Sequence, residues 1–279
     1  MDKRIQQVLA TAYGAYFNAL SHVSDRYAAR QAFRTFCKVR KGRVLPAQAA
    51  FLQSARLKRE PGFEIQTYGW EGKGETVLLV HGWESNTYRW HKLVSQLQKY
   101  GFNIIAFDAP GHGYSGGSYL HVPLYSECLQ YMIQKYRPDH LVGHSVGGLT
   151  AVYTLAIQPV NSIKKVVTIG APSEFHEIMA HFKQLLHLND RVMKALDSYV
   201  KMRFGFNIRE FSGSHFAESL PQKGLIFHDR FDKVAPFHAS EQLHSKWKDS
   251  VLVPTEGLGH SMHQDPVNLR IADFLLSGK

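Results

Sequence analysis

The chain has 279 residues, of which 44% are hydrophobic and 20% charged, so it can bury a sizeable core, and its composition excludes disordered and fibrous classes. The net charge of +10 is concentrated in residues 1–60, which hold 12 Lys or Arg against three acids. The two cysteines, Cys37 and Cys128, lie in no CxxC or Cys/His spacing, which argues against a disulfide framework and a structural zinc site.

The first 60 residues are predicted to form a basic helical extension. Ile5, Leu9, Ala12 and Tyr16 recur at helical spacing, and a basic stretch from Arg26 through Arg43 follows. We favour helices packed on the main domain with their charges in solvent. The alternative is a weak contact with an anionic membrane surface or an acidic partner. The basic residues form no recognisable nucleic-acid-binding module, so no nucleic-acid partner is predicted.

The same segment bears on location. It lacks the apolar core of a signal peptide, and no apolar run in the sequence approaches the roughly 18 residues of a membrane span. Because there are few cysteines, a reducing compartment is the simpler assumption. We therefore expect a cytoplasmic protein.

From residue 61 onward, short apolar runs rich in β-branched residues alternate with helical patterns. This alternation predicts an α/β fold, with parallel strands joined by right-handed crossovers and helices on both faces, over residues 61–171 and 222–279. Residues 172–221 contain no convincing strand and are predicted to be a helical insertion. Ligands of such sheets bind beyond the carboxyl ends of the strands. The motifs below all lie there.

The candidate nucleophile is Ser145, in a Gly-His-Ser-Val-Gly run that covers residues 143–147, after an apolar strand and before a helix. A serine in this context occupies a sharp turn that pushes its hydroxyl above the sheet, and small flanking residues are needed to allow the turn. The pentapeptide alone is a weak signal. Its position between a strand and a helix makes it informative.

A serine hydroxyl needs a histidine to accept its proton and a carboxylate to orient that histidine. His260 follows the last predicted strand, and Asp232 follows the strand before it, so these are the favoured base and acid. Asp232 is preferred to Asp229 because it lies further into the loop. His263 is the alternative base. Asp108 is expected to be a structural turn acid, although it could compete weakly as the triad acid.

The oxyanion formed during acyl transfer needs backbone N–H donors. We expect them to be the amides of Val146 and Trp83, with the Trp83 side chain lining the substrate pocket. His144, beside the nucleophile, is predicted to pack there and to contact substrate. His81 and His112 are expected to be hydrogen-bonded loop residues. The three histidines of the insertion, His176, His181 and His187, lack carboxylate partners, so no metal site is predicted.

These pieces together resemble the α/β-hydrolase family over residues 63–279. The resemblance rests on the His-Gly-Trp run at 81–83, the turn at 107–115, the run at 143–147, Asp232 and His260, in the family's order of nucleophile, acid and base. It implies an eight-stranded, mostly parallel sheet, with the insertion in the position of a helical cap. The residues leave open whether the usual first antiparallel strand is present.

The leading hypothesis is a serine hydrolase that cleaves a carboxylic ester or thioester through an acyl-enzyme, without a cofactor. The aromatic insertion favours an apolar substrate portion. A serine at this turn argues against the dehalogenase and epoxide-hydrolase branches of the family, which use a carboxylate, while peptidase and lyase activities stay open. The alternative from another class is a non-catalytic ligand-binding or scaffold protein that retains the fold.

Overall fold

The computed structural model describes residues 3–277, which contain one eight-stranded sheet in the order β1-β2-β4-β3-β5-β6-β7-β8. β1 and β2 form an antiparallel hairpin, β2 is also antiparallel to β4, and all other neighbours are parallel. The α/β prediction and its mostly parallel eight-stranded sheet are therefore confirmed. The strands are β1 Arg56–Glu60, β2 Ile65–Trp70, β3 Thr76–Val80, β4 Asn103–Phe107, β5 His140–His144, β6 Lys165–Ile169, β7 Lys223–Asp229 and β8 Ser250–Thr255.

Helices connect the strands, and a short 3-10 helix at Thr87–Trp90 precedes α4. No helix among residues 3–277 has the length and apolarity to cross a bilayer. The α-helices are α1 Lys3–Ser21, α2 Asp25–Cys37, α3 Pro46–Gln53, α4 His91–Lys99, α5 Val122–Tyr136, α6 Val146–Ile157, α7 Phe175–Leu186, α8 Asp190–Phe204, α9 Gly213–Ala217, α10 His238–Lys246 and α11 Asp265–Leu276.

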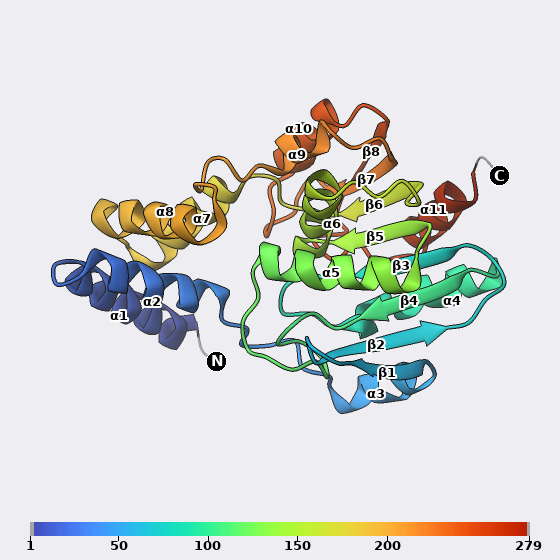
Figure 1. The fold of residues 1–279 in the computed structure, drawn as a ribbon, viewed down its shortest axis with the longest axis horizontal. Coiled ribbons are helices and arrows are strands. Elements are labelled where there is room, and N and C mark those ends of the chain that lie inside the picture. The colour runs from blue at the N-terminus through green and yellow to red at the C-terminus, as the bar shows by residue number, and fades with distance from the viewer. Residues whose placement is uncertain (1–2, 278–279) are drawn as a thin grey trace. The chain divides into compact units, whose positions relative to one another are not determined.

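The central strands are buried on both faces because their successive side chains point to opposite sides of the sheet. In β3, Val77 and Leu79 join the core beneath α4 and α11, whereas Leu78 and Val80 join the core beneath α5 and α6. The helices thus cover both faces of the sheet, as expected (Figure 1). This explains why these strands are continuous apolar runs in the sequence.

The chain divides into two compact units whose bounds differ from the predicted domains. One unit consists of the chain up to Lys38 together with Glu174–Ser212, and the other of Val39–Ser173 and the chain from Gly213 onward. The sheet unit therefore begins before residue 61, because β1 pairs along its length with β2. α9 also belongs to the sheet unit, although its residues fall within the predicted insertion.

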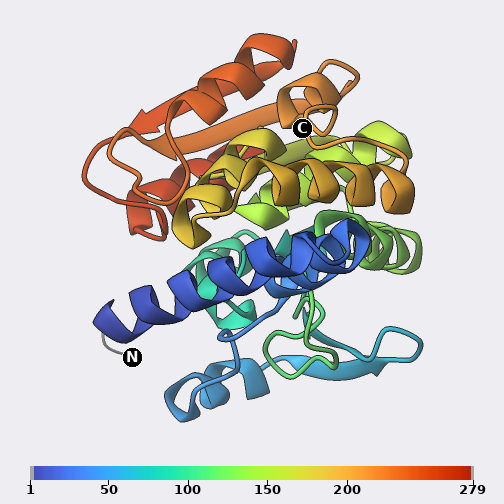
Figure 2. The ribbon, with the colours of Figure 1, turned by 90° about the vertical axis from the view of Figure 1, so that its left-hand side faces the viewer.

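The helical unit is built from α1, α2, α7 and α8. α2 packs against both α1 and α8, and α1 also contacts α7 (Figure 2). Its core is aromatic: the Phe33 ring lies 5.5 Å from Tyr199 and 5.7 Å from Phe204, measured between ring centroids. The predicted extension and the predicted insertion therefore share one core, which the sequence did not indicate. The role of cap expected for the insertion stays a prediction.

Candidate active site

Ser145 lies at the tight turn between β5 and α6, within the sheet unit. Its backbone has φ 52° and ψ −126°, a region that a residue with a side chain rarely occupies and that costs about 1–3 kcal/mol. The turn brings α6 very close to β3, since a Cβ on Gly147 would lie 2.3 Å from the Val80 carbonyl oxygen. Gly147, two residues after the serine, is thus required by the close approach of the two backbones. The strand-turn-helix prediction for this run is confirmed.

His260 and Asp232 meet at the carboxyl ends of β7 and β8. The distance between His260 Nδ1 and Asp232 Oδ2 is 2.7 Å. The Asp232 side chain is fully buried, whereas the His260 side chain is 18% exposed. Because an ionised carboxylate only accepts hydrogen bonds, Nδ1 of His260 carries the proton and Nε2 is left as the basic nitrogen.

The environment of Asp232 keeps its carboxyl ionised. Burial by itself would raise the pKa of Asp232, but hydrogen bonds from His228 and His260 and from the Val234 amide outweigh it and hold that pKa well below its usual range. The Val234 and Ala235 amides both donate to Oδ1, at 2.7 and 3.1 Å. A fixed negative charge therefore stands behind the His260 ring.

The alternative acids have other partners. Asp229 accepts from the Phe231 amide, the Thr255 hydroxyl and the Leu258 amide at 2.8–3.0 Å, so it shapes the loops around the site. Asp108 accepts from the Thr87 and Tyr114 amides and the Tyr68 hydroxyl, as expected of a turn acid. His263, the alternative base, is exposed. Of the histidines and acids considered for these roles, the structure joins His260 to Asp232.

The loop of His260 is tied to the nucleophile turn by His144. Nε2 of His144 lies 3.0 Å from the His260 carbonyl oxygen, and the two rings are 4.8 Å apart between centroids. Ser145 and His260 thus belong to one neighbourhood, although no hydrogen bond between their side chains exists within the described part of the chain. Such bonds are often long before substrate is bound.

The loop after β3 reaches the nucleophile at Gly82. A Cβ on Gly82 would lie 2.9 Å from the Ser145 Cβ, so only a glycine allows the loop backbone this close. Two buried histidines fix the loop: His81 Nε2 accepts from the Ala109 amide at 2.9 Å, and His112 Nε2 accepts from the Glu84 amide at 3.0 Å. Burial lowers the pKa of His81 to about 4 and that of His112 to about 3. Both are therefore neutral acceptors at neutral pH.

The two expected N–H donors flank this arrangement. Val146 is the first residue of α6, where the N–H groups have no acceptor within the helix. Trp83 follows Gly82, and its ring lies edge-on to His112 at 6.0 Å between centroids. Neither feature identifies the amides as donors to a substrate, so that role stays a prediction.

No group of three or more His, Cys, Asp or Glu side chains that could hold a metal ion occurs within residues 3–277. The polar groups of the site are a serine, a histidine, an acid and backbone amides. This set is suited to acyl transfer by a nucleophile and a general base.

Comparison with known proteins agrees with the fold. A family model described as the alpha/beta hydrolase fold matches residues 75–200. The solved structure of Est1E from Butyrivibrio proteoclasticus with bound ferulic acid superimposes with a TM-score of 0.67 at 20% identity, covering 80% of this chain and 98% of that one. The chain has the α/β-hydrolase fold.

Two bacterial relatives match parts of this chain. A pimeloyl-[acyl-carrier protein] methyl ester esterase from Vibrio vulnificus is 30% identical over 106 residues, which are 38% of this chain. The match spans only 40% of that esterase's length. AB hydrolase superfamily protein YisY from Bacillus subtilis is 23% identical over 248 residues, covering 73% of this chain and 92% of that protein.

His144, expected to pack beside the nucleophile and to contact substrate, does pack there, and its contact with substrate stays a prediction. The residue is 5% exposed, its Nε2 bonds the His260 carbonyl oxygen and its Nδ1 is buried. Burial lowers the pKa of His144 well below its usual value, so the ring is neutral. His144 therefore positions the loop of His260.

Sequence reasoning missed Arg89, which anchors the same loop. Its Nη2 donates to the Ser261 carbonyl oxygen at 2.9 Å, and its guanidinium lies 4.7 Å above the Trp90 ring. Burial lowers the pKa of Arg89 to about 9. A lone arginine within the four-residue 3-10 helix carries no motif, so no signal in the sequence could have found it. It holds the backbone next to the candidate base.

Proposed function

We infer that this protein is a serine hydrolase that cleaves a carboxylic ester or thioester. The observation that carries the inference is the 2.7 Å contact between His260 Nδ1 and Asp232 Oδ2, beside a serine held in a strained turn. A charged, fully buried carboxylate behind an imidazole makes Nε2 a base that can take a hydroxyl proton.

In the proposed reaction, Ser145 Oγ attacks the acyl carbon while His260 Nε2 accepts the hydroxyl proton. The amides of Val146 and Trp83 donate to the oxyanion, and one such donor elsewhere is worth about 3–4 kcal/mol. His260 then gives its proton to the leaving alcohol or thiol. A water molecule, deprotonated by the same nitrogen, hydrolyses the acyl-enzyme and restores Ser145.

The relatives support ester hydrolysis as the reaction class. The Vibrio vulnificus relative is described as a methyl ester esterase of a carrier-bound pimeloyl group, and it shares 30% identity over 106 residues. Because the match covers 40% of that esterase, its particular substrate is not carried over to this chain. Esters and thioesters both remain, since the two leaving groups are displaced by the same addition and elimination.

A fluorophosphonate probe tests the proposal, because it reacts only with an activated serine. We expect the wild type to be labelled at Ser145 and to hydrolyse p-nitrophenyl and thioester substrates of short acyl chains. Ser145→Ala should abolish both signals. The matched control is Ser95→Ala, at an exposed helical position in α4, which should leave both unchanged. Labelling that persists in the Ser145→Ala variant would overturn the assignment of the nucleophile.

The same experiment separates the alternatives. A non-catalytic protein that kept the fold would bind small acyl compounds without being labelled. A peptidase would be labelled but would cleave amide substrates faster than esters. A lyase would show neither ester nor amide hydrolysis. Labelling at Ser145 with ester or thioester turnover is the result that the proposal requires.

A further inference from the structure

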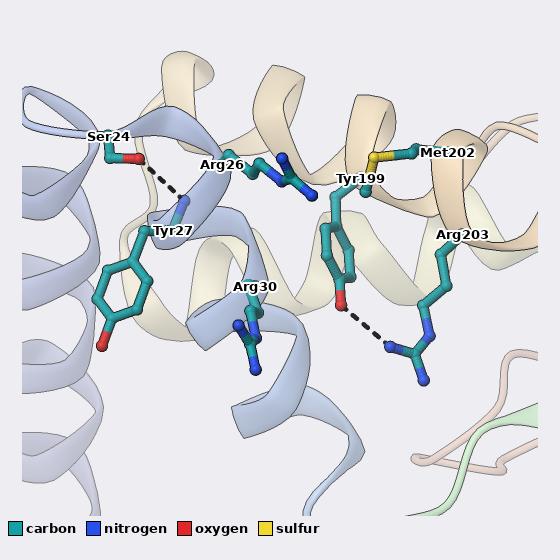
Figure 3. A pocket seen from close by; sticks show the side chains of 7 residues that line it. All are labelled: Ser24, Arg26, Tyr27, Arg30, Tyr199, Met202 and Arg203. Carbon is teal, nitrogen blue, oxygen red and sulfur yellow. Dashed lines mark hydrogen bonds between the residues drawn. The ribbon is translucent and has the colours of Figure 1, made fainter.

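The helical unit contains a basic hollow that the proposed reaction does not use. It has a volume of about 430 Å³ and lies between α2 and α8, both of which belong to this unit. In Figure 3 Arg26 extends from α2 toward Tyr199 of α8, whereas the Tyr27 ring points away from α8. The residues that line it are Ser24, Arg26, Tyr27, Arg30, Tyr199, Met202 and Arg203.

The charge of this hollow is of one sign. It is lined by three arginines and by no acidic residue. Within residues 3–277 no carboxylate lies within 4.0 Å of the charged nitrogens of Arg26, Arg30 or Arg203. The contrast is Arg191 on α8, which pairs with Asp25 through two bonds of 2.7 and 3.3 Å. The acid at the start of α2 is thus engaged elsewhere, and no carboxylate of the described residues pairs with the three guanidinium groups.

The spacing of the arginines costs stability when nothing neutralises them. Arg26 and Arg30 are four residues apart on α2, so they share one face of the helix, where like charges repel. A bound anion would convert this repulsion into attraction. Helical sequences that only need solubility usually alternate the two signs on such a face. The pair is more easily explained by a ligand than by solvation.

Part of the hollow is already arranged for a ligand. Tyr199 is 9% exposed and its ring packs on Phe33, so it forms a fixed wall. Its hydroxyl accepts a hydrogen bond of 3.2 Å from Arg203 Nη1, which holds that guanidinium at the edge of the hollow. A planar guanidinium held in this way presents paired N–H groups, the geometry that binds phosphate oxygens.

We propose that this arginine hollow, formed by Arg26, Arg30 and Arg203, binds a phosphate group, in particular a phosphomonoester, which carries up to two negative charges. Two sources could present it: a soluble phosphate ester or the headgroup of an anionic lipid. α1, in the same unit, bears exposed apolar side chains on one face, at Ile5, Val8, Leu9 and Tyr16, as do helices that lie on membranes. The test therefore includes a lipid arm.

The first arm is calorimetric titration of the full chain with inorganic phosphate at low ionic strength. We expect saturable binding to the wild type, and Arg26→Gln and Arg30→Gln should each weaken it about tenfold, the equivalent of about 1.4 kcal/mol. Lys194→Gln is the matched control, because it removes one exposed positive charge from α8 outside the hollow. It should leave the binding constant within about twofold of the wild type, since exposed charges at a distance are screened.

The second arm is co-sedimentation with phosphatidylcholine vesicles that contain phosphatidic acid as the minor lipid. Vesicles with oleic acid in its place carry negative charge without a phosphomonoester. Binding to the phosphatidic acid vesicles alone, lost in Arg26→Gln and Arg30→Gln but kept in Lys194→Gln, would assign the hollow to a lipid headgroup. Binding of inorganic phosphate with no vesicle binding would assign it to a soluble phosphate ester.

Two results would overturn the proposal. One is the absence of binding in both arms. The other is equal weakening by Lys194→Gln and the two arginine variants, which would indicate a diffuse charge effect. Circular dichroism and thermal unfolding check that the variants are folded, and their exposed positions make loss of folding unexpected. Ser145→Ala should bind phosphate like the wild type, so failure of the hydrolase proposal would leave this one standing.

Discussion

Replacement of Asp232 by asparagine is the most searching test of the site, because the structure fixes what the new amide must do. Oδ1 of Asp232 accepts from the Val234 and Ala235 amides, and Oδ2 faces His260 Nδ1. If the asparagine oxygen keeps the two amides, its NH2 group points at His260. The ring must then accept at Nδ1 and carry its proton on Nε2, where it can no longer act as a base.

The opposite orientation of the asparagine is disfavoured by energy. It would direct an NH2 group at the two amide donors and leave two buried hydrogen bonds unmade, at about 1–3 kcal/mol each. That sum exceeds the cost of shifting the proton between the nitrogens of His260. The first orientation should therefore dominate, and with it the inactive tautomer.

We expect Asp232→Asn to lower kcat by about 10⁴-fold, the loss known for the equivalent change in a serine protease, while KM changes little. That loss corresponds to about 5 kcal/mol of transition-state stabilisation. Steady-state hydrolysis of a p-nitrophenyl ester and the rate of fluorophosphonate labelling measure it, and thermal unfolding verifies that the variant is folded. Activity within tenfold of the wild type in a folded variant would refute the assignment of Asp232 and the tautomer argument with it.

Three further changes test other parts of the structure. Gly147→Ala puts a Cβ 2.3 Å from the Val80 carbonyl oxygen, so it should lower the free energy of unfolding by about 3 kcal/mol or more. Unfolding in urea measures this loss, and a variant as stable as the wild type would contradict the close approach of α6 to β3. Arg89→Ala removes the 2.9 Å bond to the Ser261 carbonyl oxygen and should lower kcat by about tenfold to a hundredfold, because His260 is then misplaced. The control is Lys92→Ala, which removes an exposed positive charge from α4. Equal activities of the two variants in steady-state assays would show that Arg89 does not support the site. The hydrogen bond from Lys164, with a further one from His140, holds the pKa of Glu75 at about 2. A carboxyl whose pKa is lowered by folding stabilises the protein above its unfolded pKa of about 4.3. This stabilisation is lost as the pH falls toward the folded pKa. Glu75→Gln should therefore destabilise the protein near about pH 6, and the difference in unfolding free energy from the wild type should shrink between about pH 4 and about pH 2; a difference independent of pH would show that the carboxylate charge contributes nothing.

Much of the candidate site could be predicted because parallel sheets impose a simple rule. Ser145, Asp232 and His260 each follow a different strand, and the carboxyl ends of parallel strands meet at one edge. The sequence order of strands and helices was enough to expect these residues together. Even the choice of Asp232 over Asp229 followed from its position deeper in the loop.

The positioning residues could not be predicted in the same way. His144 contacts a carbonyl oxygen 116 residues away, and Arg89 contacts one 172 residues away. Backbone carbonyls carry no sequence signature, so contacts to them become visible only when the loops are folded. The same holds for α2 and α8, since an apolar helix face shows that a helix will be buried but not against which partner.

The amino-acid sequence by itself determined the layered sheet and the order of the reactive groups, because strand and helix periodicities and the glycines of the turn are local properties of the chain. Only the tertiary structure decided that the N-terminal helices share a core with residues 174–212, that β1 belongs to the sheet, and that His144 supports the loop of His260. These features depend on the packing of segments far apart in sequence, and such packing is specified by shape and by pairing across space.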